Sequence, residues 1–97
     1  MPMYVVLYNW TEKGIQQVKD SPVRAEAYMK AVEGAGGKIT GLWYTMGAYD
    51  MVAVVDWPDE KAATAFLLTQ GTHGFVRTTT LLAHTREEFI EITKLMP

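Results

Sequence analysis

The segment that decides the fold reads MGAYDMVAVVDWPD (residues 46–59). It begins with Met46-Gly47-Ala48, where the glycine suits a tight turn because it tolerates backbone conformations that other residues avoid. Residues 49–57 are rich in valine and aromatic side chains, which predicts a strand. A helix is expected to open at Pro58, since acids in a first turn favour the positive end of the helix dipole. The segment therefore predicts a turn, a strand and a helix, in that order.

The flanking sequence adds three strands and a first helix. The strands are predicted where β-branched and aromatic residues concentrate, over residues 3–10, 38–45 and 75–84. A helix is predicted over about residues 22–34, because Ser21 can cap its start through its hydroxyl and the glycines that follow can end it. The helix that opens at Pro58 is expected to reach about Gln70.

A last helix is predicted from Thr85 onwards. Thr85 and Glu88 have the spacing of a capping box, in which each residue satisfies a free backbone N–H group of the other. We expect this helix to carry Phe89, Ile92 and Met96 inward. The order of elements is then βαββαβα.

This order predicts an α+β fold of the ferredoxin-like type, with residues 1–97 as a single domain and an added C-terminal helix. Two right-handed βαβ units interleave into a four-stranded antiparallel sheet in the order 4-1-3-2, with the helices on one face. The chain is long enough to bury a modest core.

The second face of the predicted sheet also carries apolar side chains. Met51, Ala53 and Val55 point to one face, whereas Val52 and Val54 point to the other. An apolar face of this kind needs a cover. We expect a second copy of the chain to provide it, face to face, as in a dimeric α+β barrel. The alternative is that the last helix folds back across the open face.

The composition of the 97 residues argues against several classes of partner. A net charge of -2 gives no concentrated basic surface, so nucleic acid is not expected to bind. There is no cysteine, which excludes disulfides and sulfur-based zinc sites. The apolar run that starts the chain is interrupted by Asn9 and lacks a basic flank, so neither a signal peptide nor a membrane span is predicted. We expect a cytoplasmic protein.

The sequence resembles the GYD domain family, a group of small and largely uncharacterised microbial proteins. The resemblance is carried by residues 46–59 and continues through residues 11–24, 36–38 and 74–81. It implies a ferredoxin-like, oligomeric domain that assembles as a dimeric α+β barrel. It implies no established reaction.

Aromatic and cationic side chains are expected to gather at one rim of the sheet, where the third strand starts and the first strand ends. The ligand-binding candidates at this rim are Trp10, Lys13, Lys19, Arg24, Tyr44 and Arg77. Cationic side chains and the free N–H groups of a helix N-terminus favour a small anion. The alternative is that these charges are only solvated, and that Asp50 pairs with Arg77 or caps the turn.

Tyr49 and Asp50 are the catalytic candidates at the same rim. Asp50 would act as a general base whose pKa is raised by burial among aromatic rings, with Tyr49 or Tyr44 donating to a developing oxyanion. The two histidines, His73 and His84, are expected near opposite ends of one strand, more than about 30 Å apart. No metal site and no cofactor are therefore predicted.

Two functions fit these observations. The first is a self-assembling binding or regulatory module that holds a small anionic metabolite at the rim. The second is a cofactor-independent enzyme of the dimeric α+β barrel type, such as a monooxygenase, an isomerase or a decarboxylase, acting on an aromatic or acidic substrate. The first is preferred, because no spacing in the sequence requires a nucleophile, a base or a metal.

Overall fold

Four antiparallel strands form the sheet of this protein, whose computed structural model describes all residues 1–97. The strands are β1 (Met3–Trp10), β2 (Lys38–Tyr44), β3 (Met51–Asp56) and β4 (Val76–Ala83). Their order across the sheet is β2-β3-β1-β4, with every neighbouring pair antiparallel. The predicted order 4-1-3-2 is the same order counted from the other edge, so the predicted topology is confirmed.

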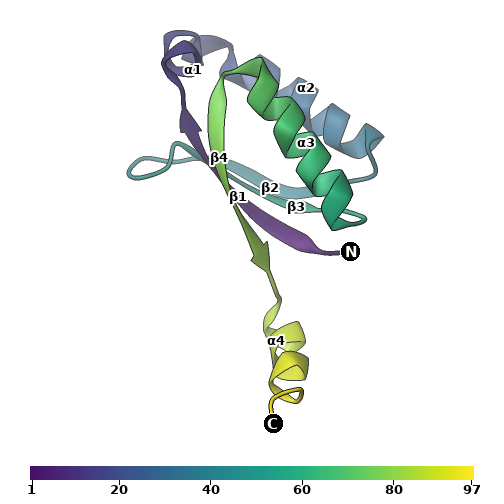
Figure 1. The fold of residues 1–97 in the computed structure, drawn as a ribbon. Helices are drawn as coiled ribbons and strands as arrows, with labels where there is room; N and C mark the ends of the chain where they lie inside the picture. The colour runs from purple at the N-terminus through teal and green to yellow at the C-terminus, as the bar shows by residue number, and fades with distance from the viewer.

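Two long helices, α2 (Ser21–Gly34) and α3 (Glu60–His73), lie side by side on one face of this sheet (Figure 1). They are the two crossover connections of an α+β ferredoxin-like arrangement, as predicted. Asp59 caps α3 by accepting a hydrogen bond from the Ala62 N–H group at 2.8 Å. Gly74 ends it in a left-handed conformation, with φ of 80°, which explains the glycine at that position.

The core lies between the sheet and these two helices. It takes alternate residues of the central strands, because successive side chains of a strand point to opposite faces. The buried apolar residues are Tyr4, Val6, Tyr8, Val32, Met51, Ala53, Val55, Trp57, Ala63 and Val76. The core is small for 97 residues, since it uses one face of the sheet only.

Some element boundaries differ from the sequence predictions. The stretch between β1 and α2 contains a short helix, α1 (Glu12–Gln16), and a 3-10 turn, η1 (Val18–Asp20), neither of which was predicted. Strand β3 starts at Met51 instead of residue 49, so residues 45–50 form a loop that projects from the sheet (Figure 1). The predicted capping role of Ser21 is wrong: Ser21 is already helical, and its buried hydroxyl contacts Tyr44 instead.

The other face of the sheet is open. Val5 pairs with Val54 on one side and with Leu81 on the other, so these three apolar side chains form a row across β3, β1 and β4. Leu7 and Val52 form a second pair beside them. Trp43, which pairs with Val52, and Leu81 remain about half exposed, at 54% and 49%. The expectation that both faces of the sheet are apolar is therefore correct.

The last helix, α4 (Arg86–Thr93), extends away from the end of β4 and leaves the open face of the sheet uncovered (Figure 1). Its start is the predicted capping box: Thr85 Oγ1 accepts from the Glu88 N–H group at 3.0 Å, and Glu88 Oε1 accepts from the Thr85 N–H group at 2.7 Å. The prediction that Phe89, Ile92 and Met96 point inward is wrong for the isolated chain, because Phe89 and Met96 are 59% and 70% exposed. The alternative that α4 covers its own sheet is also wrong.

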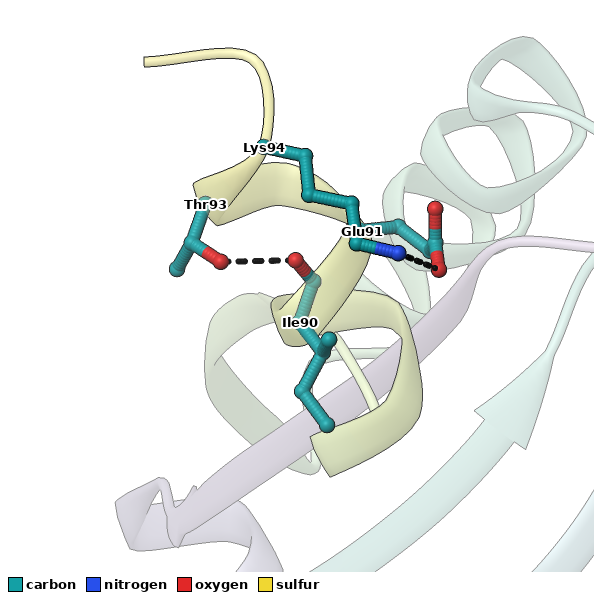
Figure 2. A network of polar contacts seen from close by, with 4 residues as sticks. All are labelled: Ile90, Glu91, Thr93 and Lys94. Atoms are coloured by element: carbon teal, nitrogen blue, oxygen red, sulfur yellow. Dashed lines mark hydrogen bonds and ion pairs between the residues drawn. The ribbon is translucent and has the colours of Figure 1, made fainter.

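The polar contacts of α4 stay within its own turns (Figure 2). Thr93 Oγ1 donates to the Ile90 carbonyl at 2.6 Å, and Lys94 Nζ donates to Glu91 Oε1 at 3.1 Å. No hydrogen bond joins residues 85–97 to the sheet or to α2 and α3. The radius of gyration is accordingly 14.7 Å, compared with about 12.5 Å for a compact domain of this length.

Candidate functional site

A cleft of about 350 Å³ opens between α2 and α3, over the end of the sheet where β1 ends and β4 begins. This volume falls in the lower part of the range of small-molecule pockets, roughly 300 to 1,000 Å³. The cleft is lined mainly by apolar and aromatic side chains. Its lining residues are Tyr8, Trp10, Ser21, Arg24, Ala25, Ala27, Tyr28, Ala31, Met51, Phe66, Thr69, Gln70, His73, Phe75 and Val76.

Small side chains on α2 explain why the two helices leave this space open. Ala25, Ala27 and Ala31 line the cleft from α2, where larger apolar residues would fill it. The rings of Tyr28 on α2 and Phe66 on α3 do meet, with centroids 5.4 Å apart. The helices are thus bridged by this pair of rings, and the alanines keep the remaining space open.

Two hydrogen-bonded tyrosines lie at the base of the cleft. The hydroxyl oxygens of Tyr8 on β1 and Tyr28 on α2 are 2.7 Å apart, and their rings pack edge to face. Burial raises the pKa of both hydroxyls above the usual value for tyrosine. At Tyr8 the neighbouring Tyr28 raises the pKa further, whereas a contact with the Gln70 side chain opposes part of the rise. Both phenols are therefore neutral across the physiological pH range.

Trp10 forms a wall of the cleft and is held from behind by Tyr44. The two rings stack with centroids 6.3 Å apart and 26° between their planes. The Tyr44 hydroxyl lies 3.0 Å from Ser21 Oγ, which also lines the cleft. Tyr44 thus supports two lining residues while remaining 49% exposed itself.

Cations gather around Phe75 at one end of the cleft. The Arg24 guanidinium lies 4.1 Å from the centre of the Phe75 ring, and Lys13 Nζ lies 4.4 Å from it. Such contacts between a cation and a ring are favourable because the ring face carries partial negative charge. Lys13 Nζ also donates to the His73 carbonyl at 2.9 Å, and Arg24 Nη1 to the Gln17 carbonyl at 3.0 Å. This end of the cleft is therefore positively charged.

Two buried polar atoms of lining residues have no hydrogen-bond partner. They are Arg24 Nη2, a donor, and Gln70 Oε1, an acceptor. A buried polar atom that has given up water without gaining a partner costs about 1–3 kcal/mol. Unpaired groups of this kind are rare in folded proteins and call for an explanation.

The structure brings together some of the predicted rim residues and separates others. Trp10 and Arg24 line the cleft, and Tyr44 and Lys13 contact its lining residues. Lys19 lies in η1, is exposed, and makes no side-chain hydrogen bond or ion pair.

Arg77 pairs with Asn9 across the strands and so lies on the open face, opposite the cleft. The expected convergence is wrong for Arg77, because adjacent residues of β4 point to opposite faces.

Tyr49 and Asp50 lie in the loop between β2 and β3 and do not line the cleft. Asp50 Oδ2 accepts a hydrogen bond from the Trp10 N–H group at 2.9 Å, and the Asp50 N–H group donates to the Tyr8 carbonyl at 2.8 Å. The Tyr49 carbonyl accepts from Thr45 Oγ1 at 2.6 Å. These contacts hold the loop to the end of β1, and no ion pair joins Asp50 to Arg77.

Three residues that line the cleft, Tyr28, Phe66 and Gln70, were not among the predicted site residues. Tyr28 packs against the core, and its contacts with distant elements leave no signal in the local sequence. The signal that was available is the run of alanines along α2, since small residues on the inner face of a helix leave room beside it. The unpaired atoms of Arg24 and Gln70 have no sequence signature.

Metal ligands do not cluster in the structure. No group of three histidine, cysteine, aspartate or glutamate side chains is close enough to hold an ion. None of the helices has the length and the apolar character that crossing a lipid bilayer requires.

The fold and the site together define a small α+β protein with one covered and one open sheet face and a ligand-sized cleft between its two long helices. Residues 4–93 match the GYD domain family, and the chain belongs to that family. The chain is also similar to a protein of Thermus thermophilus described as "Glutamine synthetase and cystathionine beta-lyase binding protein". The two sequences are 29% identical over 84 residues, which cover 86% of this chain and 88% of the relative.

Proposed function

We propose that this protein is a self-assembling binding module with a regulatory role, in which two copies of the chain associate through their open sheet faces. The observation that carries the proposal is the uncovered apolar row formed by Val54, Val5 and Leu81. The row lies in the middle of the sheet, and Trp43 flanks it as an aromatic side chain of the kind that interfaces favour. A second copy presents the same surface and so provides an apolar partner by symmetry.

The exposed area of the chain supports the same assembly. A compact monomer of 10.9 kDa exposes about 5,600 Å² according to the general relation between mass and surface. This chain exposes 6640 Å². The excess of about 1,000 Å² is comparable to the roughly 800 Å² that each partner buries in an interface of ordinary size.

Helix α4 is the second surface that we assign to self-association. Phe89, Ile90, Leu95 and Met96 are 59%, 42%, 83% and 70% exposed in the isolated chain, and the helix contacts no other element through hydrogen bonds. Large apolar side chains on a protruding helix are typical of an arm that packs on another subunit. Because α4 leaves from the edge strand β4, a second copy on the open face would lie within its reach.

The binding role has two supports. The first is the positively charged end of the cleft, where Trp10, Lys13 and Arg24 suit a small anionic metabolite. The second is the Thermus thermophilus relative, whose description names two enzymes as its partners. By analogy, we propose that this chain also binds enzymes and that its assembled form is the one that does so.

The alternative of a cofactor-independent enzyme has less support in the geometry. Its proposed base, Asp50, accepts a backbone hydrogen bond from Trp10 and lies outside the lining of the cleft. His84 lies outside it too. The tyrosines that do line the cleft are neutral phenols, which are poor general bases at neutral pH.

The test of self-assembly is a charge placed in the middle of the open face. Val54→Asp is expected to convert the oligomer into a folded monomer on size-exclusion chromatography, since the residue is only half-buried in the isolated chain. The matched control is Val23→Asp, at a residue that is 73% exposed and belongs to α2, the helix on the opposite face of the sheet. Equal elution of the wild type and Val54→Asp would contradict the proposal.

The enzyme-binding part is tested separately. Wild-type protein is immobilised and presented with purified glutamine synthetase and cystathionine beta-lyase from the organism that encodes this chain. Saturable binding of either enzyme by the wild type, and weaker binding by Val54→Asp, is the expected result. If neither enzyme binds, the partners named for the relative do not apply to this chain.

A further inference from the structure

We propose that the cleft between α2 and α3 takes a small aromatic carboxylate that also carries a hydroxyl or an amino group. The inference rests on the proposed binding function and names the chemical class of the ligand. It is argued from three properties of the lining: its aromatic walls, an unpaired donor at one place and an unpaired acceptor at another.

The walls favour a flat, apolar body. Five of the lining residues are aromatic, with Trp10 and Phe75 from the sheet end and Tyr28 and Phe66 from the helices. Aromatic rings pair with one another in stacked or edge-to-face geometry, which adds to the gain from burial. A strongly hydrated ion such as phosphate gains nothing from these walls and would lose its water on entry. The lining therefore selects against a bare inorganic anion.

Arg24 supplies the group that recognises the carboxylate. Its guanidinium donates from Nη1 to the Gln17 carbonyl and packs on Phe75, and Nη2 is buried without an acceptor. A carboxylate pairs well with the fork of an arginine and would reach Nη2 after a small turn of the flexible side chain. Lys13, on the same ring, adds a second positive charge nearby. A bound carboxylate would then provide the acceptor that Arg24 Nη2 lacks in the free protein.

Gln70 supplies the group that recognises the hydroxyl or amino substituent. Its Oε1 atom is buried without a donor, and its side chain lies near the Tyr8 hydroxyl. The hydrogen bond between the two tyrosines uses the proton of only one hydroxyl, and neither hydroxyl donates to Gln70 Oε1 in the structure. A ligand with an O–H or N–H group would donate to this oxygen. A site that is built to pair such a group discriminates against an analogue that lacks it, because its own acceptor is then left unpaired.

The experiment is an NMR titration of the ¹⁵N-labelled protein with 4-hydroxybenzoate as the probe. Benzoate lacks the donor, 4-hydroxybenzamide lacks the negative charge, and inorganic phosphate lacks the ring. Saturable shifts of the Trp10 indole and of backbone amides around Tyr8 and Gln70 are expected. Binding should be strongest for 4-hydroxybenzoate, weaker for benzoate and 4-hydroxybenzamide, and absent at these residues for phosphate.

Three variants assign the contacts. Arg24→Gln is expected to weaken 4-hydroxybenzoate about tenfold or more and to leave 4-hydroxybenzamide nearly unchanged. Gln70→Leu is expected to reduce the preference for 4-hydroxybenzoate over benzoate. Arg77→Gln, on the opposite face of the sheet, is the control and should bind like the wild type. Spectra of the free variants show whether each remains folded.

The inference is overturned if no carboxylate of the panel shifts the cleft residues, or if the shifts are unaffected by Arg24→Gln. Binding of 4-hydroxybenzoate that is lost in Arg77→Gln would place the carboxylate site on the other face and would also overturn it. The oligomer mass, measured on the same samples, separates this failure from that of self-assembly. An assembled protein that binds no probe contradicts the ligand class only, whereas a monomer that binds the probe contradicts the assembly only.

Discussion

The carboxylate of Asp50 accepts a hydrogen bond from the backbone N–H group of Trp10, 40 residues away in sequence, at 2.9 Å. This contact fastens the loop of residues 45–50 to the end of β1. Trp10 in turn stacks on Tyr44, which precedes the loop. The acid that looks catalytic in the sequence therefore positions an aromatic wall of the cleft.

The role of Asp50 predicts different effects for two substitutions. Asp50→Ala removes the acceptor and is expected to lower the free energy of unfolding by about 1.5–3 kcal/mol, the usual range for a hydrogen bond to a charged group. Asp50→Asn keeps an acceptor oxygen and should lose clearly less. Urea denaturation of both variants measures the difference. Equal losses in Asp50→Ala and Asp50→Asn would argue against a positioning role.

A side chain at position 14 is expected to destabilise the fold for a steric reason. A Cβ atom at this buried position would overlap the Phe75 carbonyl oxygen, which belongs to the backbone and has little freedom to move. Gly14→Ala is therefore expected to destabilise the fold by about 1–3 kcal/mol and to displace Phe75 from Lys13 and Arg24. Thermal unfolding gives the first effect, and NMR shifts around Phe75 give the second.

The matched control is Gly34→Ala, at the end of α2, where nothing lies within 4 Å of an added Cβ. It should be neutral, or stabilise by up to about 1 kcal/mol, because alanine is the better helix former. A loss as large as that of Gly14→Ala would show that the glycine effect is not steric.

The two tyrosines of the cleft predict a loss of stability in alkali. Burial raises the pKa of Tyr8 and Tyr28, so the folded chain keeps protons that the unfolded chain releases near pH 10. The stability that they contribute is complete below that pH and is lost as the pH rises above it. Tyrosinate absorbance and unfolding free energy, followed together, measure this. Ionisation of all five tyrosines near pH 10 without unfolding would contradict the buried pair.

The capping box of α4 predicts a local effect of acid. Hydrogen bonds from the Thr85 backbone N–H group lower the pKa of Glu88, so α4 gains stability above the usual glutamate pKa and loses it as the pH falls below. Thr85→Ala should destabilise the start of the helix by about 1 kcal/mol. Amide hydrogen exchange in residues 88–92 should become faster in Thr85→Ala, and in the wild type at low pH. Unchanged exchange rates would show that the box does not hold the helix.

The two long helices and the capping box were predictable, because periodicity, turn residues and caps are local signals. The strand order followed from the right-handed crossovers of two interleaved βαβ units. The site was predictable only in part. Trp10 and Arg24 lie close together as expected, but Arg77 lies on the other face, since a shift of one residue along a strand reverses the direction of a side chain. Tyr28 and Gln70 contribute through contacts between distant elements, which no local pattern records.

The position of α4 was not predictable for a different reason. Its apolar side chains indicated burial, but a sequence does not distinguish burial within a chain from burial between chains. In the isolated chain Phe89 and Met96 remain exposed. The same ambiguity applies to Val54 and Leu81 on the sheet, so both surfaces lead to the same question of assembly.

The most direct test of that question is the molar mass of the wild-type protein by light scattering at micromolar concentration. Association through the open sheet faces predicts twice the chain mass of 10.9 kDa, or a higher even multiple. A mass of 10.9 kDa at that concentration would contradict it, because the open sheet face and α4 would then have no partner.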